Sequence, residues 1–123
     1  MIDHITIRVS DLVKTVAFYT ATLAPLGYKL DFDQEFDGVR VVGFGRDGKI
    51  DMWFTADKPV SGPVHLALQA DTREAVDAFY AAALHAGGKN NGAPETRPKY
   101  HENYYAAFVF DPEGNNVEAV FGN

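Results

Sequence analysis

The chain has 123 residues, a length that suits one compact domain with an adequate hydrophobic core. Its net charge of −6 argues against nucleic acid or an anionic membrane as the main partner. It contains no cysteine, which excludes disulfides and thiolate chemistry, and no apolar run approaches the length of a membrane span. No signal peptide opens the chain, so we expect a soluble cytoplasmic protein.

The first half of the sequence reads as strand, helix, strand, strand, strand. Polar and apolar residues alternate over 2–9, which predicts a half-buried strand. Ser10-Asp11 then offers an N-cap, and Pro25 and Gly27 end the helix that follows. The expected elements are strands over 2–9, 28–32, 39–44 and 50–55 and a helix over 12–23.

The same order then begins again after a linker at 56–63, which is rich in Pro, Gly and Ser. A strand is expected over 64–70, and Asp71-Thr72-Arg73-Glu74 opens a helix with a capping-box pattern. That helix runs to about residue 86, and a loose segment with one short strand follows over 89–103. A hairpin over 104–121 closes the chain around the turn Asp111-Pro112-Glu113-Gly114.

The two halves are an internal repeat, because matching residues recur at a constant offset. Three pairs lie 61 positions apart: His4 and His65, Phe18-Tyr19 and Phe79-Tyr80, and Gly27 and Gly88. Each half also ends in an acidic-Gly turn and a strand that holds one acid, Asp51 or Glu118. We therefore expect one domain over 1–123 with two modules, about 1–57 and 63–123, paired about a pseudo-twofold axis.

The repeat predicts a constellation of four side chains. His4 and His65 open the first strand of each module, while Asp51 and Glu118 lie in the last. If both sheets curl into one cleft, the four meet near the pseudo-axis. Two imidazoles and two carboxylates suit a divalent metal such as Zn²⁺, Fe²⁺, Mn²⁺, Co²⁺ or Ni²⁺. Taken singly, a histidine in a strand is more often a hydrogen-bonded structural residue.

The sequence resembles the vicinal oxygen chelate superfamily, which includes glyoxalase I, extradiol dioxygenases and bleomycin resistance proteins. The resemblance covers the whole chain and is carried by DHITIRVSDLVKTVAFY, GPVHLALQA and AFVFDPEGNNVEAV. It implies an α+β fold of two βαβββ modules around a central cleft, and a homodimer. It also implies that His4, His65 and Glu118 occupy metal-ligand positions, and that Asp51 falls where glyoxalase I enzymes carry a glutamate.

The role of Asp51 separates two kinds of chemistry. As a ligand or general base, it would complete a lyase-like site together with Glu118. If Asp51 does not bind the metal, a set of two histidines and one carboxylate remains, which suits non-haem Fe²⁺ and O₂. The sequence leaves open both this choice and whether the cleft forms within one chain or between swapped halves.

Candidate substrate contacts come from the cleft faces and from the segment before the last hairpin. Arg8 and Gln69 would bind a carboxylate or carbonyl group, and Trp53, expected on the same face as Asp51, would wall the pocket. The segment 89–105 is basic and aromatic, and we expect it to form a lid for an anionic or aromatic substrate. Its candidate residues are Lys99 and Tyr104 for binding and His101 and Tyr105 as proton donors.

These observations favour a metal-dependent lyase or isomerase that chelates two neighbouring oxygens of a small substrate, because both acids are present. An Fe²⁺-dependent dioxygenase is the second hypothesis. A metal-free protein that sequesters a drug or metabolite in an aromatic cleft is the third.

Overall fold

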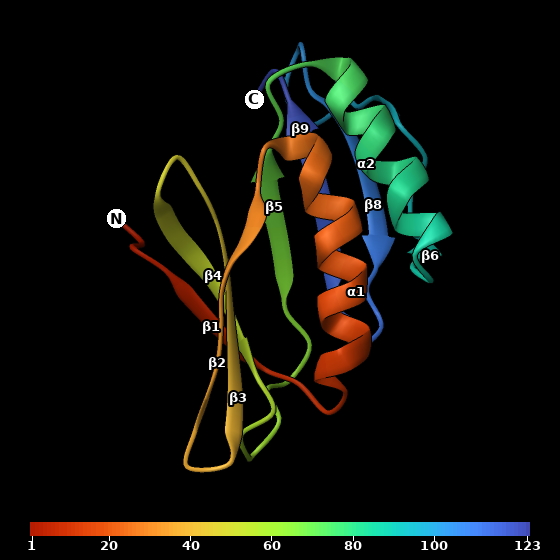
Figure 1. The fold of residues 1–123 in the computed structure, drawn as a ribbon. Coiled ribbons are helices and arrows are strands. Elements are labelled where there is room, and N and C mark those ends of the chain that lie inside the picture. Colours follow the sequence, from red (N-terminus) through yellow and green to blue (C-terminus); the bar gives the residue numbers. More distant parts are fainter.

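Each half of the sequence builds one β-sheet in the computed structural model, which describes residues 1–123 (Figure 1). The first half contains β1 (Ile5–Arg8), α1 (Leu12–Leu23), a short 3₁₀ helix (Ala24–Leu26), β2 (Lys29–Phe36), β3 (Val39–Arg46) and β4 (Lys49–Thr55). The second half contains β5 (His65–Gln69), α2 (Arg73–His85), β6 (Lys89–Asn90), β7 (Glu95–Thr96), β8 (Tyr105–Phe110) and β9 (Asn116–Phe121). The predicted α+β fold of two related sheets is confirmed.

The two sheets share one topology, as duplication requires. The first sheet has the order β1-β4-β3-β2 and the second β5-β9-β8-β6, so in both the first and last long strands are neighbours. These neighbours, β1 with β4 and β5 with β9, are parallel, whereas the hairpins β3-β4 and β8-β9 are antiparallel. The segment 89–103 holds two short strands rather than one, and both pair with β8.

Both helices begin where the sequence supplies an N-cap. The carboxylate of Asp11 accepts a hydrogen bond from the Lys14 backbone N–H at 3.1 Å at the start of α1. The hydroxyl of Thr72 accepts one from the Ala75 backbone N–H at 3.0 Å at the start of α2. Each cap satisfies an amide that the helix itself leaves unpaired. No helix in the structure is long and apolar enough to span a membrane.

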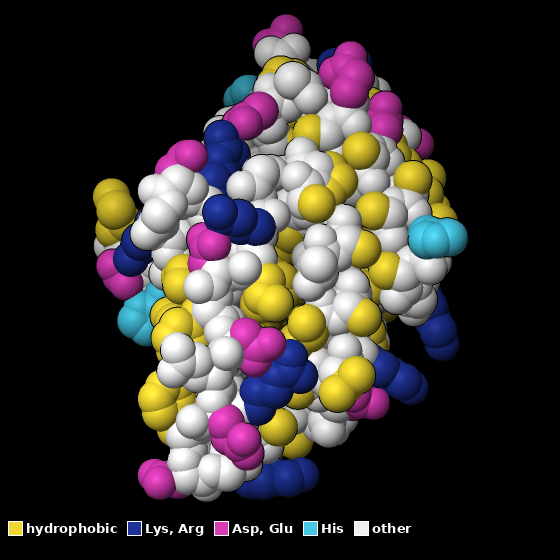
Figure 2. Space-filling model, viewed as in Figure 1, with side chains coloured by type: hydrophobic (Ala, Val, Ile, Leu, Met, Phe, Trp, Pro, Cys, Tyr) yellow, Lys and Arg dark blue, Asp and Glu magenta, His cyan; other side chains and the backbone are white.

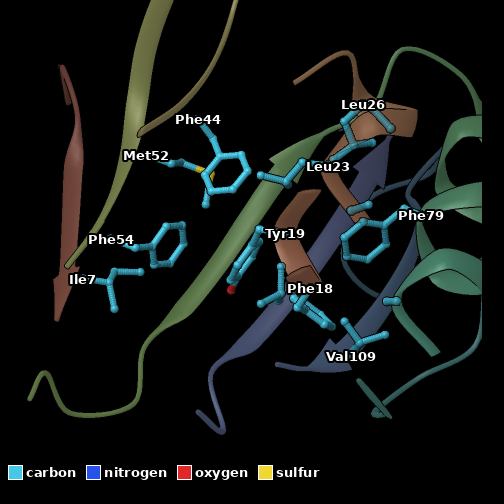
Figure 3. Packing of buried hydrophobic residues seen from close by; sticks show 14 of the residues in the cluster. Ile7, Phe18, Tyr19, Leu23, Leu26, Phe44, Met52, Phe54, Phe79 and Val109 are labelled. Atoms are coloured by element: carbon cyan, nitrogen blue, oxygen red, sulfur yellow. The ribbon is translucent and has the colours of Figure 1, made fainter. Parts of the chain in front are cut away.

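One hydrophobic core joins both sheets and both helices (Figure 3). Tyr19 of α1 stacks on Phe54 of β4 with ring centroids 4.6 Å apart, while its neighbour Phe18 lies on the side of the second sheet. Phe79, the counterpart of Phe18 in α2, is also fully buried. Ile7, Met52 and Phe54 fill the helix-facing side of the first sheet as strand parity predicts, which leaves the opposite sheet faces free for a site.

The turn between β8 and β9 ties the second half to the first. The carboxylate of Glu113 accepts hydrogen bonds from the backbone N–H of Ser10 at 2.9 Å and of Asp11 at 3.1 Å, just before α1. Asp111, only 5% exposed, accepts a hydrogen bond from the Tyr19 hydroxyl at 2.6 Å and another from the Asn115 side chain at 2.9 Å. This turn is therefore part of the packing around α1 as well as a connection between strands.

Candidate metal centre

A histidine and a buried carboxylate meet on the second sheet. Ala67 of β5 pairs with Glu118 of β9, and His65 lies two residues earlier on the same face of β5. The His65 Nε2 atom lies 3.1 Å from Glu118 Oε1. Glu118 is 2% exposed although it carries a carboxylate, so burial there requires compensation by nearby groups.

The other ring nitrogen of His65 determines which atom faces Glu118. His65 Nδ1 lies 3.1 Å from the backbone carbonyl oxygen of Asn116. A carbonyl can only accept, so Nδ1 carries the hydrogen in this contact. In neutral histidine, Nε2 is then an acceptor that faces a second acceptor, the Glu118 carboxylate. Two such groups are stabilised by a proton or a cation between them, and this donor set suits a divalent metal.

The Nδ1 atom of His4, directly before β1, also contacts an oxygen. This atom lies 2.7 Å from Asp3 Oδ1, and the other Asp3 oxygen accepts a hydrogen bond from Lys49 Nζ at 2.8 Å. A carboxylate that holds Nδ1–H is a common support for a metal-binding histidine, because it leaves Nε2 free. The lysine also lowers the pKa of Asp3 to about 2, with His4 acting in the same direction. Sequence reasoning missed Asp3, although it directly precedes His4.

The predicted convergence does not occur within one chain. Nowhere do three or more of the chain's His, Asp and Glu side chains come close enough together to hold a metal ion. Of the four residues expected to converge, only His65 and Glu118 are in contact, whereas His4 contacts Asp3 directly before β1. A centre that contains all the predicted ligands would therefore require the first and second sheets to face each other in an arrangement that a single chain does not adopt.

Asp51 is not the counterpart of Glu118, contrary to the expectation from sequence. Thr6 lies 61 positions before Ala67, and Thr6 pairs with Trp53 where Ala67 pairs with Glu118. Trp53 therefore occupies the position of the second acid. Asp51 is the extra residue of a β-bulge, since the neighbouring pairs are Phe44 with Met52 and Gly45 with Ile50.

The bulge also turns Asp51 to the other side of the sheet from Trp53. The side chains of Trp53 and Ile50 both lie over Gly43, whereas Asp51 Oδ2 accepts a hydrogen bond from the Tyr28 hydroxyl at 2.8 Å. Burial raises the pKa of Tyr28 to about 12, and the hydrogen bond to Asp51 adds to the effect. Asp51 Oδ1 is buried without a partner. The prediction that Asp51 and Trp53 share a face is therefore wrong. Asp51 lies on the other side of the sheet from Trp53 and is not placed to act as a ligand there.

The free face of the first sheet is hollowed around His4. A cavity of about 660 Å³ is lined by 11 residues, among them His4, Thr6 and Trp53. Aromatic side chains continue beside it, because Phe32 contacts Trp53 edge-to-face at 5.3 Å and stacks on Phe36 at 6.2 Å. Trp53 thus walls a pocket, as expected, but beside His4 rather than beside Asp51.

Arg8 and Gln69 lie on the exposed strand faces that were predicted for them, with Thr6 and Ala67 respectively. The Arg8 Nε donates a hydrogen bond to the backbone carbonyl of Pro59 at 2.6 Å, and its backbone N–H donates to the Ser61 hydroxyl at 2.9 Å. Arg8 therefore holds the linker between the modules. Gln69 lies on the same exposed face of β5 as His65 and Ala67, and it lines cavities beside Asp71.

The two adjacent tyrosines point to opposite sides of the second sheet. The Tyr104 hydroxyl donates a hydrogen bond to Glu118 Oε2, whereas the Tyr105 hydroxyl donates to Asp77 of α2 at 2.6 Å. Partial burial raises the pKa of Tyr104 to about 12, with the Glu118 hydrogen bond acting in the same direction. Tyr105 therefore lies on the helix side, and its predicted role as a proton donor in the cleft is wrong.

The remaining lid residues lie at the surface. The Lys99 ammonium lies 5.1 Å from the ring centroid of Tyr100, and both residues are exposed. His101 is exposed, and only its backbone carbonyl has a partner, the Tyr104 N–H at 3.2 Å. Acidic and basic side chains are interspersed over the face in Figure 2, without a continuous basic surface.

A family model described as the Glyoxalase/Bleomycin resistance protein/Dioxygenase superfamily matches residues 1–119. The chain belongs to this superfamily. The resemblance found in the sequence is thus confirmed, with Glu118 inside the matched region. The description of the superfamily includes glyoxalases, bleomycin resistance proteins and dioxygenases, so membership is compatible with each of the three hypotheses.

Solved structures support the fold. A glyoxalase/bleomycin resistance protein from Albidiferax ferrireducens superposes with a TM-score of 0.77 at 24% identity, covering 98% of both chains. A related domain from Frankia reaches 0.75 at 15% identity, covering 100% of this chain and 98% of the other. A glyoxalase I mutant from Zea mays reaches 0.73 at 22% identity over 97% of this chain, which spans 43% of the maize chain. No curated protein matches the chain.

Proposed function

We propose that the protein is a divalent-metal-dependent enzyme that acts on a small substrate with two neighbouring oxygen atoms. The observation that carries this proposal is that the two histidines make the same kind of contact through Nδ1. His4 and His65 lie 61 positions apart, and each has Nδ1 within hydrogen-bond distance of an oxygen, so that Nε2 is the nitrogen available to a metal. In His65 this Nε2 atom already faces Glu118 Oε1 at 3.1 Å. Metal-binding histidines usually donate the other ring N–H to an oxygen in this way, which orients the ring.

The ligand set of the proposal is His4, His65 and Glu118. Because His4 lies on the first sheet and the other two on the second, we propose that a second copy of the chain completes the centre in a homodimer. The aromatic pocket around Trp53 would then face His65 and Glu118 of that copy. The chain has an exposed 8-residue edge strand, β2, and open sheet faces, which make such pairing physically reasonable.

The three-residue set favours oxygen-dependent chemistry over the lyase that the sequence suggested. The lyase hypothesis depended on two acids, and Trp53 stands at the position of the second one. Two histidines and one carboxylate leave open positions for a substrate and O₂, as in non-haem Fe²⁺ oxygenases. A ferrous ion bound there would activate O₂ and a chelated diol together.

The chain's own residues would position such a substrate. Trp53, with Phe32 beside it, offers a flat apolar wall for a ring. The contacts of Glu118 with His65 and Tyr104 fix the position of its carboxylate, which supports the role of a ligand over that of a mobile proton carrier. Asp51 has no role in this proposal.

Metal analysis of the purified protein tests the proposal. We expect about one metal per chain in the wild type, strong loss in Glu118→Gln and His65→Ala, and unchanged content in Asp51→Asn. Loading with Fe²⁺ should give oxygen uptake with catechols, and no isomerisation of hemithioacetals should occur with Zn²⁺ or Ni²⁺. Isomerase activity without oxygen uptake would restore the lyase hypothesis.

A metal-free result would favour the third hypothesis. If the wild type stays empty after reconstitution and binds aromatic ligands equally well with and without a chelator, the protein is a binding protein. Sedimentation of wild type in parallel tests the dimer, since a monomer that binds metal fully would contradict the shared centre.

A further inference from the structure

Both oxygens of the Glu118 carboxylate are occupied by side chains of the same sheet face. Oε1 lies 3.1 Å from His65 Nε2, and Oε2 accepts a hydrogen bond from the Tyr104 hydroxyl. Glu118 is 2% exposed, so water does not replace either contact. The orientation of this carboxylate therefore depends on these two neighbours.

Tyr104 is held in place by its own loop. Its backbone N–H donates to the His101 carbonyl at 3.2 Å, and its carbonyl accepts from the Arg97 N–H at 2.7 Å. Its ring meets Tyr100 edge-to-face at 5.3 Å. The loop also passes so close to Gly122, just after β9, that a Cβ there would lie 2.1 Å from the Asn103 carbonyl oxygen. These backbone contacts fix the position of the Tyr104 hydroxyl beside Glu118.

We propose that Tyr104 is a positioning residue that fixes the Glu118 carboxylate for metal binding, rather than the substrate contact that the sequence suggested. This inference depends on the proposed metal centre. The hydroxyl donates to Oε2 and so keeps Oε1 turned toward His65 Nε2, the ring nitrogen that carries no hydrogen in neutral histidine when Nδ1 donates to the Asn116 carbonyl. Without the hydroxyl, the carboxylate can rotate and its buried oxygen loses its donor.

Metal titration of three proteins tests this role. We compare wild type, Tyr104→Phe and the matched control Tyr105→Phe, whose hydroxyl donates to Asp77 on the other side of the sheet. The probe is Co²⁺, followed by calorimetry and by its visible absorption. We expect the affinity of Tyr104→Phe to fall about 10–100-fold, as for other groups that orient a metal ligand, and Tyr105→Phe to bind within about twofold of wild type.

Each result decides between defined alternatives. Equal affinity and an identical Co²⁺ spectrum in wild type and Tyr104→Phe would overturn the positioning role and leave the metal centre intact. A wild type that binds no Co²⁺ would overturn both this inference and the proposed function. Urea unfolding of both variants shows whether they are folded, and a fall in affinity in a fully folded Tyr104→Phe supports the proposal.

Discussion

The hydroxyl of Tyr19 allows a sharp test of the packing around α1. Tyr19 is fully buried, and its hydroxyl donates to Asp111 Oδ2 at 2.6 Å. Tyr19→Phe removes that donor and keeps the ring, so the stacking on Phe54 at 4.6 Å remains. Hydrogen bonds to charged groups contribute about 1.5–3 kcal/mol, and we expect the free energy of unfolding to fall by this amount. A larger loss is not expected, because the Asn115 side chain still donates to Asp111.

The internal repeat supplies the matched control. Tyr80 lies 61 positions after Tyr19, and its hydroxyl donates to Asn90 Oδ1 at 3.0 Å in an exposed setting. Tyr80→Phe should cost less than about 0.5 kcal/mol. Urea unfolding at one fixed protein concentration measures both variants. Equal losses in the two, or no loss in Tyr19→Phe, would refute the argument from burial and charge.

Three other changes have defined outcomes. Gly45→Ala would place a Cβ 2.2 Å from the Lys49 backbone oxygen and should lower the free energy of unfolding in urea by at least about 1–3 kcal/mol. Gly62→Ala is the control and should be neutral, because a Cβ there meets open space. Glu113→Ala should cost about 0.5–2 kcal/mol, and a neutral effect would show that its contact with the start of α1 is not formed in solution. Lys49→Met should return the pKa of Asp3 from about 2 toward its ordinary value in an NMR titration. Because that pKa is lowered, the contact stabilises the fold above a pH of about 4 and is lost as the pH falls toward 2.

The constant offset between the halves made most of the fold predictable. Patterns set 61 positions apart, such as His4 and His65, identify the same element twice. Capping residues also located the helices well, since α1 begins at Leu12 and α2 at Arg73. These signals are local and repeated, so tertiary contacts reinforce them.

The assignment of Asp51 failed because strand parity holds only in an unbroken ladder. Glu118 follows its turn glycine by four residues and Asp51 by three, so the two acids do not hold equivalent positions in their strands. The bulge opposite Gly45 adds one residue to β4, and Trp53, five residues after its glycine, becomes the counterpart of Glu118. A bulge depends on cross-strand contacts, which the sequence of one strand does not reveal.

On the second sheet, the contact between His65 and Glu118 was predictable, whereas the hydrogen bond from Tyr104 to Glu118 was not. His65 and Glu118 are in contact, as their matching positions in the repeat suggested, because β5 pairs in parallel with β9. The choice between Tyr104 and Tyr105 was not predictable, since it depends on where β8 begins. A shift of one residue reverses which tyrosine reaches Glu118.

The Glu113 contact has a consequence for the order in which the protein can be made. Glu113, which binds the backbone at the start of α1, lies 103 positions after Ser10 in the sequence. A nascent chain that ends at the linker lacks this acid, so the first amides near α1 stay bound to water. The Asp111 carboxylate that accepts from Tyr19 also emerges late. On the ribosome, the first half therefore completes its packing only after the turn that holds Asp111 and Glu113 has been synthesised.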